Sequence, residues 1–364
     1  ASMRVAEVVV RILEDEGIEA AFGIPGAAIN PVYEFLGTSR QIKHYTARHE
    51  EGALHAADGY SRATGCTKLG LAICTSGPGA TNFVTGLYTA QIDSIPLIAI
   101  TGQNVRSQLG KEAFQAVDIV DIARPVCKAA WCITEPEQAP AILRKAFWTA
   151  REGRPGPVLI DLPLDVQMAD IPYDPANDAS IPVVKQPPQP ALIERAIEML
   201  LAAENPIMIM GGGVLLAYAT KECVALAEYL SLPVVTTYMA TGGIPAQHPL
   251  HVGHIGIQVG GPFGNQFFMG SDLVLAIGNR FNDRHTGALP VYVEGRKFIH
   301  INIEPEHIGR IVPTELGIVA DAKLALEALL AEAHRRTAPR PPSERVRSIP
   351  QERARMARRT DYDQ

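Results

Sequence analysis

The sequence has little of what marks an extracellular, membrane or metal-binding protein. Its five cysteines are odd in number and form no Cys-x-x-Cys pair, which argues against a disulfide framework and against a zinc site. No apolar run reaches the roughly 18 residues that a membrane-spanning helix needs. Because 33 Lys and Arg stand against 39 Asp and Glu, no basic surface for nucleic acid is expected. We therefore expect a cytoplasmic protein with reduced thiols and no signal peptide.

Several catalytic signatures are also absent. There is no Gly-x-Ser-x-Gly nucleophile elbow, since Ser76 lies in Thr-Ser-Gly-Pro-Gly instead. The triplet Gly211, Gly212 and Gly213 lacks the full Gly-x-Gly-x-x-Gly spacing, so an NAD-dependent oxidoreductase is only a remote alternative. Five histidines cluster in the second half without a His-x-x-x-His pair, and we expect no metal ligands among them. They are His248, His251, His254, His285 and His300.

What the chain does contain is a repeated alternation of short apolar runs and amphipathic helices. The alternation occupies residues 1–169 and returns in residues 191–337, which is typical of parallel sheets covered by helices on both faces. Residues 170–190 contain six prolines and are predicted to be a linker, and residues 338–364 a second linker or tail. The predicted fold class is α/β, with two doubly wound parallel-sheet domains.

The apolar runs also locate individual elements. The predicted strands lie in the segments AAFGIPG, 69–74, 96–101, PVLIDLP, PIMIM, PVVTT, LVLAIGN and KFIHINI. The predicted helices are 4–16, 31–36, 51–63, 80–90, 137–151, 191–203, 218–230 and 321–336.

Candidate ligand positions in the first domain follow from these strand ends. Glu50 stands at the head of the Ala-rich helix 51–63, although a solvated carboxylate at a helix N-terminus is the ordinary alternative. Gly26 follows the first strand and Gly77 follows the strand 69–74, and both could simply be tight-turn residues. Ligands of open α/β sheets lie in the crevice at the carboxyl ends of the strands. These turns are therefore candidates for both roles.

In the second domain, three apolar strands end in polar or glycine-rich segments. Gly211 to Gly213 follow the first of them, AIGNRFNDRHTG ends the second, and HINIEP ends the third. We expect these three strand ends to converge on one crevice. Arg280 and Arg284 lie between glycines there, which favours anion or carboxylate binding over a surface role.

Together these segments resemble the thiamine-diphosphate-dependent acetohydroxyacid synthase family, and its glyoxylate carboligase branch most. The resemblance is carried by the segments GIPGAAINPVYEFL, TSGPGATN, ITGQ, KEAFQAVDIVDIARPV, EGRPGPVLIDLPLDVQ, GNRFNDRHTG and EGRKFIHINIEPEHIGRIVPTELGIVADAK. It implies a pyrimidine-binding domain over 1–169 and a central FAD-binding domain over 191–337.

The resemblance also implies roles for individual residues. In that family the glutamate that matches Glu50 hydrogen-bonds the aminopyrimidine ring and exchanges a proton with it, which activates the cofactor for attack on 2-oxoacids. Arg284 matches a residue that contacts the carboxylate of the acceptor substrate. The implied contacts to thiamine diphosphate are Pro25, Gly26, Thr75, Gly77, Asn82 and Gln115. The implied contacts to FAD, which takes no part in redox chemistry, are Arg154, Gly211, Gly212, Gly213, Gly278, Asn279, Arg280, Asp283, Glu304 and Asp321.

Two departures from the family pattern limit this interpretation. Glyoxylate carboligases have an apolar residue where this chain has Glu50, so acetolactate synthesis from pyruvate is an alternative to the condensation of two glyoxylates. The family holds Mg²⁺ and the diphosphate with a C-terminal Gly-Asp-Gly domain that this sequence lacks, so the chain alone is expected to be inactive. A non-catalytic module that binds FAD or ADP is the alternative from another class. Because the family's site forms between subunits, we expect a homodimer or homotetramer.

Overall fold

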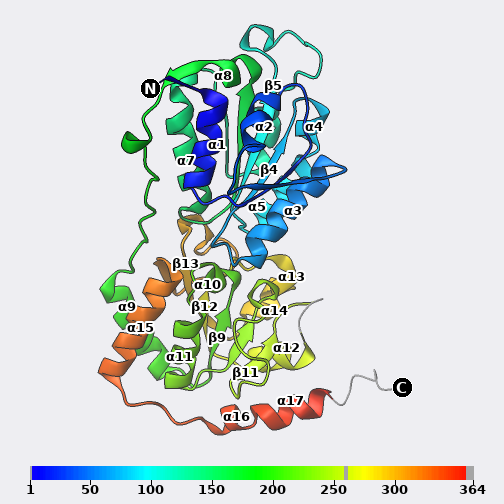
Figure 1. The fold of residues 1–364 in the computed structure, drawn as a ribbon. Coiled ribbons are helices and arrows are strands. Elements are labelled where there is room, and N and C mark those ends of the chain that lie inside the picture. The colour runs from blue at the N-terminus through cyan, green and yellow to red at the C-terminus, as the bar shows by residue number, and fades with distance from the viewer. Residues whose placement is uncertain (1, 258–260, 358–364) are drawn as a thin grey trace. The chain divides into compact units, whose positions relative to one another are not determined.

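The chain folds into two compact units, each built on one parallel sheet. The computed structural model describes residues 2–257 and 261–357, and the two units divide between Val184 and Lys185. Each unit contains a six-stranded sheet whose neighbouring strands are all parallel, with helices on both faces (Figure 1). The predicted fold class is therefore confirmed.

The sheet of unit 1 has the strand order β3-β2-β4-β5-β7-β6. Its strands are β2 Ala20–Gly23, β3 Lys43–Thr46, β4 Gly70–Cys74, β5 Leu97–Gln103, β6 Ala129–Cys132 and β7 Pro157–Pro163. The chain adds β3 on one side of β2 and β4 on the other, so the winding reverses between β2 and β4. At such a switch point the loops that follow the two strands diverge and leave a crevice at their carboxyl ends.

The helices of unit 1 cover the two faces of this sheet. They are α1 Val5–Asp15, α2 Asn30–Leu36, α3 Glu50–Ala63, α4 Pro78–Thr81, α5 Val84–Ile92, α6 Ile119–Ala123, α7 Ala139–Arg151 and α8 Leu164–Met168. Successive strand side chains point to opposite faces, so Ile73 joins the core under α1 and α7 whereas Ala72 joins the core under α3 and α5. Burial on both faces explains why the central strands are continuous apolar runs.

Unit 2 repeats this plan with the strand order β11-β10-β9-β12-β13-β14. Its strands are β9 Pro206–Met210, β10 Val234–Thr236, β11 His251–His254, β12 Leu273–Ile277, β13 Lys297–Asn302 and β14 Leu316–Val319. Its helices are α9 Pro190–Ala202, α10 Gly212–Leu216, α11 Thr220–Leu230, α12 Pro262–Met269, α13 Asp283–Thr286, α14 Leu289–Val293, α15 Ala322–Arg336, α16 Glu344–Arg347 and α17 Ile349–Ala357. Here the winding reverses between β9 and β12.

The sequence predictions found the four central strands of each sheet and missed the edges. The unpredicted strands β3, β6, β11 and β14 are the outermost strands of the two sheets. An edge strand has one unpaired side and less cover, so β3 and β11 can carry polar residues, whereas β6 and β14 are apolar but only four residues long. The predicted helix 80–90 is also two helices, because α4 ends at Thr81 and α5 begins at Val84.

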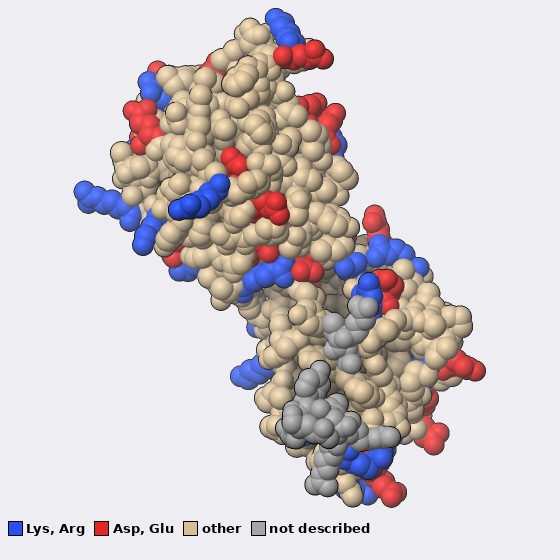
Figure 2. Space-filling view, turned by 90° about the vertical axis from the view of Figure 1, so that its right-hand side faces the viewer, with Lys and Arg blue, Asp and Glu red and all other residues tan. Residues whose placement is uncertain are grey.

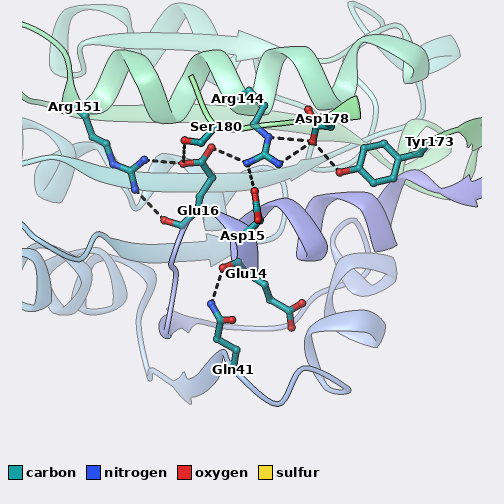
Figure 3. A network of polar contacts seen from close by, with 9 residues as sticks. All are labelled: Glu14, Asp15, Glu16, Gln41, Arg144, Arg151, Tyr173, Asp178 and Ser180. Atoms are coloured by element: carbon teal, nitrogen blue, oxygen red, sulfur yellow. Dashed lines mark hydrogen bonds and ion pairs between the residues drawn. The ribbon is translucent and has the colours of Figure 1, made fainter. Parts of the chain in front are cut away.

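The first half of the predicted linker 170–190 is fixed to unit 1. Its strand β8, Asp170–Pro172, pairs antiparallel with β1, Ser2–Arg4. Further along, the Arg144 guanidinium donates to Asp178 Oδ2 at 2.9 Å and to Glu16 Oε1 at 2.8 Å (Figure 3). The Ser180 hydroxyl donates to Glu16 Oε2 at 3.0 Å. Residues 170–180 therefore belong to unit 1.

Part of the predicted tail 338–364 also packs on its unit. Helices α16 and α17 lie in it, and the Ile349 side chain is fully buried in the core of unit 2. The Arg353 guanidinium donates to the main-chain oxygen of His251 at 2.7 Å. The tail prediction is wrong for these helices, because a few buried contacts order a segment whose own composition is polar. Residues 358–364 lie outside the described residues.

The surface is mixed in charge. On the face that Figure 2 shows, the described Lys and Arg side chains are interspersed with Asp and Glu. Within each unit, the described residues on that face form no continuous basic track of the kind that a nucleic-acid backbone requires. Over the described part of the chain, no helix combines the length and apolarity required to cross a membrane.

Candidate functional site

Glu50 lies at the switch point of unit 1. It is the first residue of α3, whose N-terminus is capped by His49, because His49 Nδ1 accepts the Glu51 amide at 3.1 Å. The Glu50 side chain is half-buried, and its Oε2 accepts a hydrogen bond of 2.9 Å from Asn82 Nδ2. The carboxylate is thus held over the turn that follows β4 instead of lying in bulk solvent.

Two loops meet beneath this carboxylate without intervening side chains. A Cβ at Gly26 would lie 2.5 Å from the Cβ of Thr75, so only glycine allows the turn after β2 to approach the end of β4. The Ala28 amide donates to Thr75 Oγ1 at 3.2 Å. A Cβ at Gly79 would lie 3.6 Å from Glu50 Oε1, so the absence of a side chain leaves space beside this oxygen.

Gln115 closes the same region from the segment after β5. A Cβ at Gly77 would lie 2.7 Å from the Cβ of Gln115, and both residues have left-handed backbone, with φ of 62° and 55°. Gln115 and Pro25 are exposed. The structure therefore brings Gly26 to Thr75 and Gln115 to Gly77, on the loops next to the turn over which Asn82 holds Glu50.

Arg154 lies at the opposite end of the strands of unit 1 from Glu50. It precedes β7, so it is at the amino ends of the strands, whereas Glu50 is at their carboxyl ends. Its Nε donates to Ser94 Oγ at 2.7 Å and its Nη2 to the main-chain oxygen of Gln91 at 3.0 Å. Within unit 1 the structure does not bring Arg154 to the site of Glu50.

In unit 2, the loops after β9 and β12 touch through their backbones at the switch point. The Gly211 amide donates to the oxygen of Ile277, and the Gly213 amide to that of Gly278, both at 2.8 Å. A Cβ at Gly213 would lie 2.7 Å from the Gly278 Cα, and a Cβ at Gly212 would lie 2.9 Å from the Met239 Cβ. The glycine triplet is therefore required for close packing, although its spacing is not that of a dinucleotide loop.

The end of β13 joins this junction through Asn279. The main-chain oxygen of Asn279 accepts from His300 Nε2 at 2.7 Å and from Asn302 Nδ2 at 2.9 Å. Asn302 Oδ1 in turn accepts the Glu304 amide at 2.9 Å. Three strand ends thus converge, and Asn302, which the sequence analysis did not single out, connects two of them. The signal for it was a polar residue at the last position of an otherwise apolar strand.

The Asn279 side chain has an unusual environment. It is 8% exposed, yet neither Oδ1 nor Nδ2 has a hydrogen-bond partner among the described residues. A buried amide without partners carries a desolvation cost of about 1–3 kcal/mol, so such groups are rare unless a ligand satisfies them. This amide makes the carboxyl ends of β9, β12 and β13 a candidate ligand position.

The remaining predicted residues of unit 2 differ in their surroundings. Arg280 and Glu304 are half-buried near Asn279, whereas Asp283 and Arg284 are exposed on α13. Asp321 is buried at the N-terminus of α15, where its Oδ2 accepts the Leu324 amide at 3.1 Å. Asp321 therefore caps a helix, a role that does not require a ligand.

The histidines have separate partners. His248 hydrogen-bonds Glu228, His254 hydrogen-bonds Thr236, and His285 hydrogen-bonds Tyr292. Within residues 2–257 and 261–357, no group of three His, Cys, Asp or Glu side chains could hold a metal ion.

Replacement of Gly278 by alanine tests the junction in unit 2. Its φ is 69°, and a Cβ would lie 2.7 Å from the Gly213 Cα, so we expect Gly278→Ala to lower the unfolding free energy by about 3 kcal/mol. Gly309→Ala is the matched control, because Gly309 has a φ of 72° but open space around its Cβ position. It should cost only about 1 kcal/mol. Equal losses in calorimetric unfolding of the two variants would contradict the tight packing.

Comparison with known proteins supports the same division of the chain. Residues 3–122 match the family "Thiamine pyrophosphate enzyme, N-terminal TPP binding domain", and residues 193–329 match "Thiamine pyrophosphate enzyme, central domain".

Similar proteins are longer than this chain. A glyoxylate carboligase of Escherichia coli O157:H7 is 47% identical over 366 residues, which cover 100% of this chain and 62% of the relative. The acetolactate synthase large subunit of Corynebacterium glutamicum is 43% identical, with 89% and 52% covered. A probable acetolactate synthase large subunit of Methanocaldococcus jannaschii is 42% identical, with 90% and 56% covered. The chain thus spans about half to three fifths of these relatives, and it belongs to the thiamine pyrophosphate enzymes, whose N-terminal and central domains it carries.

Proposed function

We propose that this chain forms part of a thiamine-diphosphate-dependent carboligase. The enzyme releases CO₂ from one glyoxylate and joins the remaining one-carbon fragment to the carbonyl of a second, which yields tartronate semialdehyde. The observation that carries the dependence on thiamine diphosphate is the Glu50 carboxylate held by Asn82 over the glycine turn after β4; this carboxylate does not itself select glyoxylate over pyruvate. The relative that is 47% identical is a glyoxylate carboligase, which supports glyoxylate as the substrate.

The residues at the switch point of unit 1 fit the aminopyrimidine half of the cofactor. Glu50 Oε2 is already hydrogen-bonded by Asn82, while Oε1 faces the space that Gly79 leaves. Backbone at Gly26, Gly77 and Gly79 lets a flat ring approach closely. When bound, thiamine diphosphate supplies a nucleophilic carbon on which 2-oxoacids lose CO₂.

Glu50 would hold and transfer one proton. Asn82 fixes the orientation of the carboxylate through Oε2, so Oε1 would be left to hydrogen-bond a ring nitrogen of the pyrimidine and to exchange a proton with it. Gln115, on the far side of Gly77, borders the space in which the substrate would react.

The switch point of unit 2 fits FAD, which we propose as a structural cofactor. The Gly211–Gly213 backbone would approach the nucleotide closely, and the buried Asn279 amide would gain the hydrogen bonds it lacks. Arg280, Asp283 and Glu304 lie on the segments that leave the same strand ends, and Asp321 follows the neighbouring strand β14. The same strand ends could bind ADP instead of FAD. The visible absorbance of the bound ligand would distinguish the two, because only FAD contains a flavin.

A leucine at position 279 separates ligand binding from stability. Leucine has a similar shape and no polar atoms, so Asn279→Leu should raise the unfolding free energy of the ligand-free chain by about 1–3 kcal/mol. The same change should weaken FAD binding at least tenfold, because the amide would no longer hydrogen-bond the ligand. Calorimetric unfolding and flavin titration measure the two effects. If Asn279→Leu instead lowered the unfolding free energy of the ligand-free chain, the Asn279 amide would already have hydrogen-bond partners without a ligand.

Other parts of the proposal concern the substrate and the assembly. Arg284 is exposed on α13, and its guanidinium can bind the carboxylate of the acceptor substrate. We expect Mg²⁺ and the diphosphate to be bound within the part of the relatives' length that this chain does not span. A homodimer or homotetramer would complete the site between subunits. Five free cysteines support a reducing compartment such as the cytoplasm.

An extended chain that spans the full length of the relatives tests the activity. With thiamine diphosphate and Mg²⁺ present, we expect CO₂ release from glyoxylate to exceed release from pyruvate, with tartronate semialdehyde as product. Preference for pyruvate would identify the enzyme as an acetolactate synthase. Failure to release CO₂ from either acid would overturn the proposed function.

A further inference from the structure

A row of polar and thiol side chains crosses the sheet of unit 1 below the site of Glu50. Cys74 on β4 lies in register with Thr101 on β5, Thr101 with Asp161 on β7, and Asp161 with Cys132 on β6. Residues in register on parallel strands share a face of the sheet. This is the face of Cys74 and Leu159, on which α6 packs against β6 and β7, and α4 against β5.

Asp161 is the only acid in this row, and hydrogen-bond donors surround it. It is 2% exposed. Its Oδ1 accepts from the Thr101 hydroxyl at 2.7 Å, and its Oδ2 accepts from Gln103 Nε2 at 3.0 Å. Cys132 on β6 is in register with Asp161, which places its thiol beside the same carboxylate. Because both hydrogen-bonding partners, Thr101 and Gln103, donate to it, the geometry suits an ionised carboxylate.

Gln103 connects Asp161 to the segment that follows β5. Its Nε2 also donates to the main-chain oxygen of Val117 at 2.7 Å, and its Oε1 accepts the Asn104 amide at 2.9 Å. Asn104 Nδ2 donates to the main-chain oxygen of Phe114 at 2.9 Å. Two neighbouring side-chain amides therefore fix the far end of the segment 104–118, and Asp161 orients one of them.

This segment carries Gln115, which lies against Gly77 in the turn below Glu50. Gln115 has a φ of 55°, a conformation that costs energy for a residue with a side chain and persists only where its surroundings hold it. The Ala116 amide donates to the main-chain oxygen of Ala113 at 2.9 Å, and the contacts of the Gln103 and Asn104 amides hold the same segment on either side of Gln115. The position of Gln115 thus depends on the anchoring of the segment.

We propose that Asp161 is a positioning residue, whose ionised carboxylate holds Gln103 so that the segment 104–118 keeps Gln115 at the candidate active site. The proposal rests on the proposed function for its link to turnover. The anchoring itself is a property of unit 1 and is testable without any activity.

Protonation of Asp161 should loosen the anchor. Burial raises the pKa of this carboxyl from the ordinary 3.8 to about 7, and the negative charge of Asp118 also raises the pKa. The neighbouring Thr101, Gln103 and Cys132 side chains lower the pKa but do not outweigh burial. The folded chain therefore takes up a proton here as the pH falls through about 7. Hydrogen bonds to a charged group are roughly twice as strong as neutral ones, so the hold on Gln103 weakens below that pH.

Amide hydrogen exchange of the 364-residue chain tests the anchor. We expect the protection factors of the segment 104–118 to fall about fivefold between pH 8 and pH 6, with a midpoint near 7. Residues 36–42 serve as the internal reference, because their hydrogen bonds involve none of these groups. Protection of 104–118 that does not change across this pH range would overturn the proposal.

Three variants separate the anchor from a general loss of structure. Asp161→Asn has nearly the same shape but cannot ionise, so its protection should be low and independent of pH. Asn104→Ala removes only the contact to Phe114 and should lower protection while the midpoint stays near 7. Cys132→Ser introduces a stronger donor to the carboxylate, so the midpoint should move to lower pH. An unmoved midpoint in Cys132→Ser would count against the proposal even if Asp161→Asn fails to fold.

The link to turnover is tested in the extended chain. If Asp161 positions the site, the acid limb of the kcat/KM profile should follow the exchange midpoint, and Cys132→Ser should move both to lower pH. A kinetic limb that stays in place while the exchange midpoint moves would overturn the link. An extended chain without activity would contradict the proposed function, whereas the exchange experiment decides the anchor by itself.

Discussion

Glu50→Gln in the extended chain should lower kcat by roughly 10²–10⁴-fold, the range that general acid and base groups contribute. Glutamine keeps the shape and can still accept the hydrogen bond from Asn82 Nδ2. It cannot exchange a proton with the cofactor, so the loss would isolate that step. Initial rates of CO₂ release from glyoxylate, with calorimetric titration of thiamine diphosphate, measure turnover and binding separately.

Glu51→Gln is the matched control for this experiment. Glu51 is the next residue of α3, and its carboxylate only pairs with His55 at 3.6 Å on the surface, a contact that contributes little. We expect its turnover to stay within about twofold of the unaltered enzyme. If Glu50→Gln were as active as Glu51→Gln, Glu50 would be an ordinary helix N-terminal carboxylate.

Arg144→Met should destabilise unit 1 by about 3–5 kcal/mol, the usual cost of removing one partner from a buried ion pair. Arg144 is 4% exposed and contacts Asp15, Glu16 and Asp178, all within 2.9 Å (Figure 3). Without the guanidinium, the buried Glu16 loses one of its two arginine partners, since Arg151 still donates to its Oε2 at 2.7 Å.

The chain offers a convenient measurement for this prediction. Both of its tryptophans, Trp131 and Trp148, lie in unit 1, so their fluorescence during denaturant unfolding reports on that unit. Arg11→Met is the control, because Arg11 on α1 pairs with Glu7 one turn earlier at a solvent-exposed position, so its loss should cost less than about 0.5 kcal/mol. A loss below 1 kcal/mol in Arg144→Met would show that the network contributes little to stability.

Much of the fold was predictable because the central strands of both sheets are buried on both faces. Segments such as 96–101 and KFIHINI are apolar throughout for this reason, and their spacing identified two doubly wound domains. The edge strands β3 and β11 carry polar residues and were missed. The helices α16 and α17 were missed because their order comes from a few tertiary contacts, such as that of Arg353 with His251.

The candidate site was predictable where its residues stand next to strand ends. Glu50, Gly26 and Gly77 could be named because turns after parallel strands share one edge of a sheet. Asp161 could not, since in the sequence it is a lone acid inside the apolar strand PVLIDLP, and only its register with Thr101 and Cys132 reveals the donors around it.

By itself, the sequence determined which segments become buried strands and which residue types stand at their ends, because both follow from periodicity over a few positions. The tertiary structure alone decided which of those ends meet. Arg144 donates to Glu16, which is 128 residues away in the sequence. Gln103 donates to both Asp161 and Val117, and these three residues come from three different segments. Such contacts depend on strand order and on the closure of long loops, which no local pattern encodes.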